Sequence, residues 1–82
     1  METSGRVKGI ALLWFDDSKI PLADKIRRAA AAYEVKYGRK ATRCRVNLST
    51  VGLKADVPEK VDDIKIVIDG RVLKNHFWMG PE

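Results

Sequence analysis

The sequence has few of the residues that stabilise very small proteins: one cysteine and one histidine occur among 82 residues. A single cysteine cannot form an internal disulfide bond, so we expect a reducing, cytoplasmic location. One cysteine and one histidine without suitably spaced carboxylates also fall short of a metal-ligand set, and we expect no metal or cofactor. The chain must therefore be stabilised by a well-patterned core or by a partner chain.

Long apolar segments are also missing. The longest run, Ile10 to Phe15, has six residues, against roughly 20 needed to cross a bilayer, so we expect no membrane association. Residues 1–5 lack the basic start and apolar stretch of a signal peptide, and we expect a flexible tail. The length leaves room for a single domain, residues 1–82.

The first half of the chain predicts a strand, a helix and a second strand. Residues 6–15 are strand-like with apolar side chains at both parities, so we expect burial on both faces. Pro21 and Gly38 bracket a helix. Its apolar residues recur at helical spacing, namely Leu22, Ile26, Ala29, Ala30, Tyr33 and Tyr37. Residues 41–48 alternate, which predicts a half-buried strand with a basic outer face.

The second half is less regular. Residues 49–63 form a long connecting loop, which could hide a short strand near residues 51–54. Residues 64–68 form the next strand. We prefer a type I′ hairpin turn at Asp69-Gly70 after it; the alternative is a turn at Lys74-Asn75 followed by a short strand over residues 76–79. The order β-α-β-β(-β) predicts an α+β fold of two layers, with one helix packed on a mostly antiparallel sheet.

Charge is concentrated in one segment. Residues 25–45 contain eight lysines and arginines against one acid, Glu34, although the whole chain carries only +5. We expect the helix flank, the Gly38 turn and the outer face of the next strand to form one basic band that attracts phosphate. Its residues are Lys25, Arg28, Lys36, Arg39, Lys40, Arg43 and Arg45. The alternative is a solvated face with no ligand.

Aromatic side chains could complete such a site. Trp14, His76 and Trp78 are the candidates for base stacking or for contact with a partner. The segment containing His76 and Trp78 has a second interpretation, as a strand that closes the core.

Evidence for catalysis is weak. Cys44 and His76 are the one combination that could form a thiol–imidazole pair. The alternation of residues 41–48 instead places Cys44 in the core as a small hydrophobic residue. No nucleophile elbow, phosphate-binding loop or dinucleotide motif occurs, so we expect no enzyme and no small-molecule ligand.

Two short motifs carry a family resemblance. Lys36-Tyr37-Gly38 ends the helix, and His76, Trp78 and Gly80 form a His-x-Trp-x-Gly segment near the C-terminus. With these motifs, the chain resembles a group of small uncharacterised bacterial and phage-associated proteins. The resemblance implies a cytoplasmic single-domain protein linked to mobile elements, and it implies no catalytic residue.

Two functions are therefore expected. The first is a non-enzymatic binding module whose basic surface contacts nucleic acid or another polyanion. The alternative is a homodimeric protein-interaction domain. It follows from the first strand, which is apolar on both faces while a single helix can cover only one face of a sheet.

Overall fold

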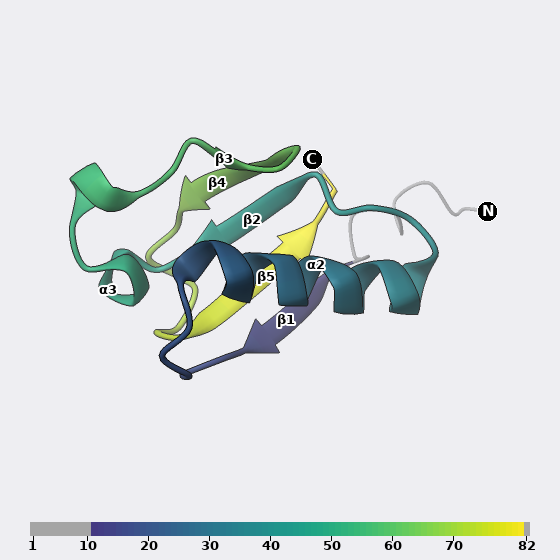
Figure 1. Cartoon of the computed structure of the whole chain (residues 1–82), viewed down its shortest axis with the longest axis horizontal. Coiled ribbons are helices and arrows are strands. Elements are labelled where there is room, and N and C mark those ends of the chain that lie inside the picture. The colour runs from purple at the N-terminus through teal and green to yellow at the C-terminus, as the bar shows by residue number, and fades with distance from the viewer. Residues whose placement is uncertain (1–10, 82) are drawn as a thin grey trace.

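A five-stranded sheet with one long helix across it forms the protein (Figure 1). The computed structural model describes residues 11–81, so the predicted tail and residues 6–10 of the first predicted strand lie outside the described residues. The elements in chain order are β1 (Leu12–Phe15), α2 (Leu22–Tyr37), β2 (Arg43–Val46), α3 (Leu48–Val51), the 3₁₀ helix η1 (Lys54–Asp56), β3 (Lys60–Val61), β4 (Ile64–Ile68) and β5 (His76–Gly80).

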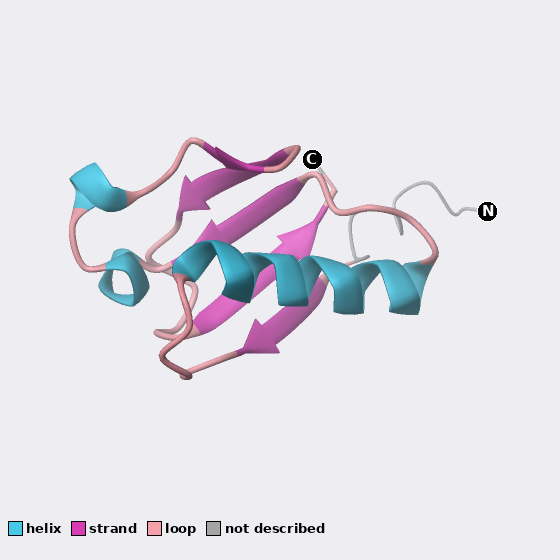
Figure 2. Ribbon diagram, in the orientation of Figure 1, coloured by secondary structure: helices cyan, strands magenta, loops and turns pink. Residues whose placement is uncertain are grey.

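The strands lie in the order β1-β5-β2-β4-β3. Three of the four pairings are antiparallel, and β2 with β4 is parallel. The helix α2 crosses one face of this sheet, while α3 and η1 lie beyond its end (Figure 2). The predicted α+β fold, with one helix packed on a mostly antiparallel sheet, is confirmed. None of the helices within residues 11–81 is long and apolar enough to span a membrane.

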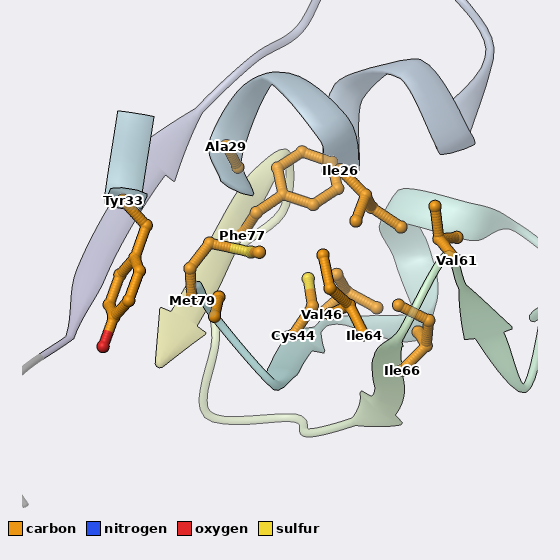
Figure 3. Close-up of a cluster of buried hydrophobic side chains, with 11 residues drawn as sticks. Ile26, Ala29, Tyr33, Cys44, Val46, Val61, Ile64, Ile66, Phe77 and Met79 are labelled. Atoms are coloured by element: carbon orange, nitrogen blue, oxygen red, sulfur yellow. The ribbon is translucent and has the colours of Figure 1, made fainter. Parts of the chain in front are cut away.

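The helix α2 forms where the sequence predicts it. Pro21 occupies the N-cap position, and Gly38 ends the helix in the left-handed region at φ 71°, where a residue without Cβ is favoured. Ile26, Ala29 and Tyr33 are fully buried. Figure 3 shows these helix residues packed over side chains from the strands, among them Phe77, Met79, Cys44 and Val46, which are fully buried as well. Burial of one helical face therefore defines the core and leaves the other sheet face without a helix.

The long connection between β2 and β4 is a crossover. Because β2 and β4 are parallel neighbours, the chain has to return along the sheet before it can enter β4, and such a return takes a dozen residues or more. Helical turns fill this path. The strand predicted near residues 51–54 is wrong: Leu48–Val51 and Lys54–Asp56 are short helices, and the strand in this segment is Lys60–Val61.

The predicted strand 41–48 also ends earlier than expected. Asn47 accepts a hydrogen bond from the Ser49 backbone N–H at 2.9 Å and so caps α3. Leu48 therefore begins a helix instead of extending β2.

The preferred hairpin turn at Asp69-Gly70 is wrong. Within residues 11–81, the positive φ angles belong to Gly38, Gly52, Asp62 and Asn75, whereas a type I′ turn needs positive φ at both central residues. The physical reason is topological: β5 pairs with β2 on the side away from β4, so residues 69–75 must cross the end of β2. The alternative turn at Lys74-Asn75 is confirmed, with the His76 N–H donating to the Leu73 carbonyl at 3.1 Å.

The first strand is not buried on both faces as expected. Leu12 and Trp14 pack against the core beneath α2, but Leu13 and Phe15 are 56% and 55% exposed. The helix α2 covers one face of the sheet. On the opposite face, no helix within residues 11–81 covers Leu13 and Phe15. The second face of the sheet therefore presents apolar groups to solvent.

Candidate functional site

The face of the sheet opposite α2, termed the open face below, carries the candidate site. Side chains alternate across each strand, so the residues between the core positions point to this face. Cross-strand register groups them into rows. One row is Lys60, Lys65, Arg43 and Gly80; the next is Val67, Arg45, Trp78 and Leu13; and the last is His76 and Phe15.

Trp78 lies at the centre of the open face. A Cβ atom at Gly80 would come within 2.6 Å of the Cη2 atom of the indole, so the ring lies along β5 over a residue that has no side chain. The Cζ atom of Arg45, the register partner of Trp78 on β2, is 5.1 Å from the ring centroid. A cation at this distance is attracted by the ring quadrupole. The strands thus hold the guanidinium group of Arg45 over the ring of Trp78.

A row of cations flanks this ring. Lys60 pairs with Lys65, and Lys65 pairs with Arg43, on three neighbouring strands. Like charges directly opposite each other destabilise a sheet. Arg45 follows Arg43 two residues along β2 and adds a fourth positive charge. An anionic ligand laid along this row would meet positively charged side chains on three neighbouring strands.

Further aromatic surface lies on the other side of Trp78. The Phe15 and His76 rings are tilted neighbours, with centroids 5.0 Å apart. The Nδ1 atom of His76 lies 2.9 Å from the Lys74 carbonyl oxygen; because a carbonyl oxygen only accepts, this nitrogen carries the hydrogen. The bond fixes the imidazole beside the exposed Phe15 ring. Ring faces and cations are therefore adjacent on one surface.

A depression of about 600 Å³ adjoins the ring of Trp78. Ligand sites of proteins commonly enclose about 300–1,000 Å³. Its lining comes from the sheet and from the 69–75 connection, namely Leu13, Arg45, Asp69, Arg71, Val72, Leu73 and Trp78. Hydrogen bonds attach this connection to the crossover: Asn47 Nδ2 donates to the Val72 carbonyl at 2.9 Å and to the Gly70 carbonyl at 3.5 Å, and the Asn75 N–H donates to Thr50 Oγ1 at 2.8 Å. The rim of the depression is thus tied to the sheet.

Asp69 organises the charged wall of this depression. Its carboxylate accepts hydrogen bonds from the Arg71 backbone N–H at 3.0 Å, from Arg71 Nε at 3.0 Å and from Arg71 Nη2 at 2.9 Å. Arg45 Nη1 is 3.5 Å from the same carboxylate. The side-chain hydrogen bond from Arg71 is the largest cause that lowers the pKa of Asp69 from 3.8 to about 2. The carboxylate is therefore ionised at neutral pH and holds both arginines in place.

Asp69→Asn is expected to lower stability at neutral pH and to have a clearly smaller effect at pH 2, where the folded-state carboxylate is about half protonated. A carboxylate with a lowered pKa stabilises the folded state above its unfolded pKa of 3.8, and this contribution is lost as the pH falls through about 2. Thermal unfolding of both proteins between pH 2 and pH 7 measures the difference. Asp17→Asn, at an exposed aspartate outside the site, is the control. Equal destabilisation at pH 7 and pH 2 would contradict the assignment.

The structure does not bring the seven predicted cations into one band. Cys44 and Val46 face α2, so Arg43 and Arg45 point to the opposite face of the sheet. Lys25, Arg28 and Lys36 belong to α2, on the other layer, and Arg39 and Lys40 are exposed in the connection between α2 and β2. The expectation failed because it followed charge along the chain, while strand alternation and helix packing separate neighbours in sequence into two layers.

The predicted stacking residues are divided in the same way. His76 and Trp78 lie on the open face, but Trp14 pairs in register with Phe77 and packs against the core beneath α2. Since Phe77 and Met79 fill the core, β5 both closes the core and presents His76 and Trp78. The interpretation of this segment as a strand that closes the core is confirmed, and a stacking role for His76 and Trp78 stays a prediction.

Cys44 and His76 do not form a pair. Cys44 is fully buried on the face toward α2 (Figure 3), whereas His76 lies on the open face near the other end of β5. Burial raises the pKa of the Cys44 thiol to about 12, which keeps it protonated at neutral pH. Cys44 serves as a small core residue.

Sequence reasoning missed Phe15, Lys60, Lys65, Asp69 and Arg71. Lys65 could have been found, because it alternates with the isoleucines of residues 64–68, whereas Phe15 lies on a strand that was expected to be buried on both faces. Lys60 belongs to a two-residue strand with no pattern to detect. Arg71 reaches the site because residues 69–75 cross the end of β2. This crossing depends on the parallel pairing of β2 with β4, for which the sequence has no local signal.

Comparisons with known proteins add no relative: no protein-family model, no curated protein and no solved structure matches this chain. The resemblance based on the Lys-Tyr-Gly and His-x-Trp-x-Gly segments stays a prediction. Any function must therefore rest on the chemistry of the open face.

Proposed function

We propose that this protein is a non-enzymatic module that binds single-stranded nucleic acid across the open face of its sheet. The observation that carries the proposal is the placement of Trp78 over Gly80, with Arg45 beside the ring and the cation row alongside. Aromatic faces stack on bases, and lysine and arginine neutralise phosphates. A platform of rings bordered by cations supplies both contacts on one surface.

Single strands are the better ligand for such a face. In a duplex the base faces are already stacked on one another and the base edges are paired, so a ring on a sheet surface cannot reach them. An unpaired strand can turn its bases toward Trp78 and Phe15 while its phosphates lie along Lys60, Lys65 and Arg43. The proposed ligand therefore follows from the position of rings beside the charges.

Fluorescence anisotropy with labelled oligonucleotides tests the proposal. We expect an unstructured 12-mer to bind more tightly than a duplex of the same length, with an affinity that falls as salt is added. If the four cations Lys60, Lys65, Arg43 and Arg45 each neutralise one phosphate, the logarithm of the binding constant falls by about 3 for each tenfold rise in salt, from roughly 0.7 per single-strand contact. Absence of binding at tens of micromolar in low salt, or tighter binding of the duplex, would contradict it.

One observation favours a second function, a protein-interaction domain that forms homodimers. Leu13 and Phe15 expose more than half of their surface on the open face, and apolar surface of this kind often marks an interface. A two-fold contact between two open faces would also bring the cation rows of both copies together, which costs free energy. Light scattering after size exclusion distinguishes the two functions: a dimer that oligonucleotide does not dissociate supports the second.

A further inference from the structure

Arg71 combines exposure with fixed geometry. Its side chain is 86% exposed, and an arginine in that position ordinarily samples many rotamers. Here the Nε and Nη2 atoms donate to the two carboxylate oxygens of Asp69, at 3.0 and 2.9 Å. The carboxylate in turn is only 10% exposed and accepts the Arg71 backbone N–H. The Asp69 carboxylate therefore orients the guanidinium group before any ligand arrives.

The contact with Asp69 determines which donors remain for a ligand. A guanidinium group has five N–H bonds, and the two used by Asp69 leave the edge formed by Nη1 and the second hydrogen of Nη2. This edge is a pair of parallel donors that matches two adjacent acceptors on a planar group. Since Arg71 lines the same depression as Trp78, a base stacked against the indole can meet this donor pair with its own edge.

The chemistry of the bases selects one of them. Guanine presents two acceptors, O6 and N7, on the same edge, and a bidentate arginine contact with them is the commonest specific pairing. Adenine offers one acceptor beside an amino donor on that edge, which would face the donors of Arg71. Of the other wall residues, Leu13, Val72 and Leu73 are apolar and do not distinguish the bases, and Arg45 lies over the Trp78 ring.

We propose that the depression beside Trp78 is a guanine-selective base site in which Arg71, held by Asp69, reads the O6 and N7 atoms. This inference rests on the proposed binding of single-stranded nucleic acid and adds a base preference to it. Because Asp69 orients the fork beforehand, the contact costs less side-chain entropy than that of an unpaired arginine.

Oligonucleotides with a single changed base test the inference. The probe is a labelled nonamer of uridine whose central base is uridine, adenine, guanine or 7-deazaguanine, which lacks N7. We expect the guanine nonamer to bind about tenfold more tightly than the uridine and adenine nonamers, as one bidentate contact allows. The 7-deazaguanine nonamer loses most of that gain. Equal binding of guanine and 7-deazaguanine, or equal binding of all four, would overturn the inference.

A protein variant separates base reading from phosphate contact. Arg71→Lys keeps the charge but lacks the planar fork, and we expect it to lower the affinity for the guanine nonamer to that for the all-uridine nonamer. Arg39→Lys, an exposed arginine outside the open face, is the matched control and keeps the preference. If Arg71 contacts phosphate instead, Arg71→Lys weakens all four nonamers equally, and the inference fails while nucleic-acid binding stands. No binding of any nonamer would overturn the proposed function itself.

Discussion

Replacement of Trp78 by leucine is expected to weaken binding of a single-stranded oligonucleotide about tenfold. Stacking of a base on an aromatic side chain contributes about 1–3 kcal/mol, and leucine keeps apolar contact but has no ring face. Anisotropy titrations at constant low salt measure the loss, and the salt dependence should not change because the cation row is intact. The loss of affinity therefore reports on the ring of Trp78, whereas the slope of the logarithm of the binding constant against the logarithm of salt concentration reports on the cation row.

The control for this variant is Trp14→Phe. Trp14 packs beneath α2 on the other face of the sheet, and its replacement should leave the affinity within twofold. Both variants are compared by circular dichroism and thermal unfolding, which exclude a loss of fold. Equal weakening by Trp78→Leu and Trp14→Phe would contradict the placement of the site on the open face.

Phe77→Ala is expected to produce the largest loss of stability in the chain. Phe77 is fully buried at the centre of β5, between the pairings with β1 and β2. Truncation of a buried phenylalanine costs about 3–5 kcal/mol. A domain of this size has a free energy of unfolding of about 4–12 kcal/mol at roughly 0.05–0.15 kcal/mol per residue. The variant should therefore lose a quarter or more of the free energy of unfolding, and at the lower end of this range it is largely unfolded at room temperature.

Urea unfolding monitored by circular dichroism measures this effect. Val35→Ala is the matched control, because Val35 is 87% exposed on α2 and its replacement should change the free energy of unfolding by less than about 0.5 kcal/mol. A loss below about 1 kcal/mol for Phe77→Ala would show that the core is not centred on this ring.

The helix α2 and the strands β2 and β4 could be predicted because their patterns are local. Pro21, Gly38 and the buried positions Ile26 and Tyr33 carry the helical period and its ends, and Cys44 and Val46 mark the buried side of β2. Each of these signals depends on residues a few positions apart. The α+β class followed from their order along the chain.

The strand pairing could not be predicted in the same way. Asp69-Gly70 has the composition of a tight hairpin, but the chain continues across the end of β2 because β5 pairs there instead of with β4. The competition is between a local turn preference and the burial of Phe77 and Met79 beneath α2 at the centre of the sheet. Tertiary burial prevails, because two fully buried side chains outweigh one turn.

The predicted basic band was wrong for the same reason, because strand pairing cannot be predicted from local patterns. Arg45 and Trp78 are 33 positions apart in sequence, and only the register of β2 against β5 places them in contact. The predicted basic band joined residues that are close in sequence, such as Lys40 and Arg43. Arg43, Arg45, His76 and Trp78 of the open face could be named from the sequence, but which charges share a face with which rings follows from the sheet order.

The fluorescence of Trp78 in the Trp14→Phe variant tests the central claim most directly. With Trp14 replaced, Trp78 is the only tryptophan in the chain, and stacking of a base on its ring should quench its emission. Titration with an unstructured, unlabelled oligonucleotide is predicted to give saturable quenching with the same midpoint as the anisotropy titration. Unchanged Trp78 emission at oligonucleotide concentrations that saturate the anisotropy signal would show that nucleic acid binds elsewhere on the protein.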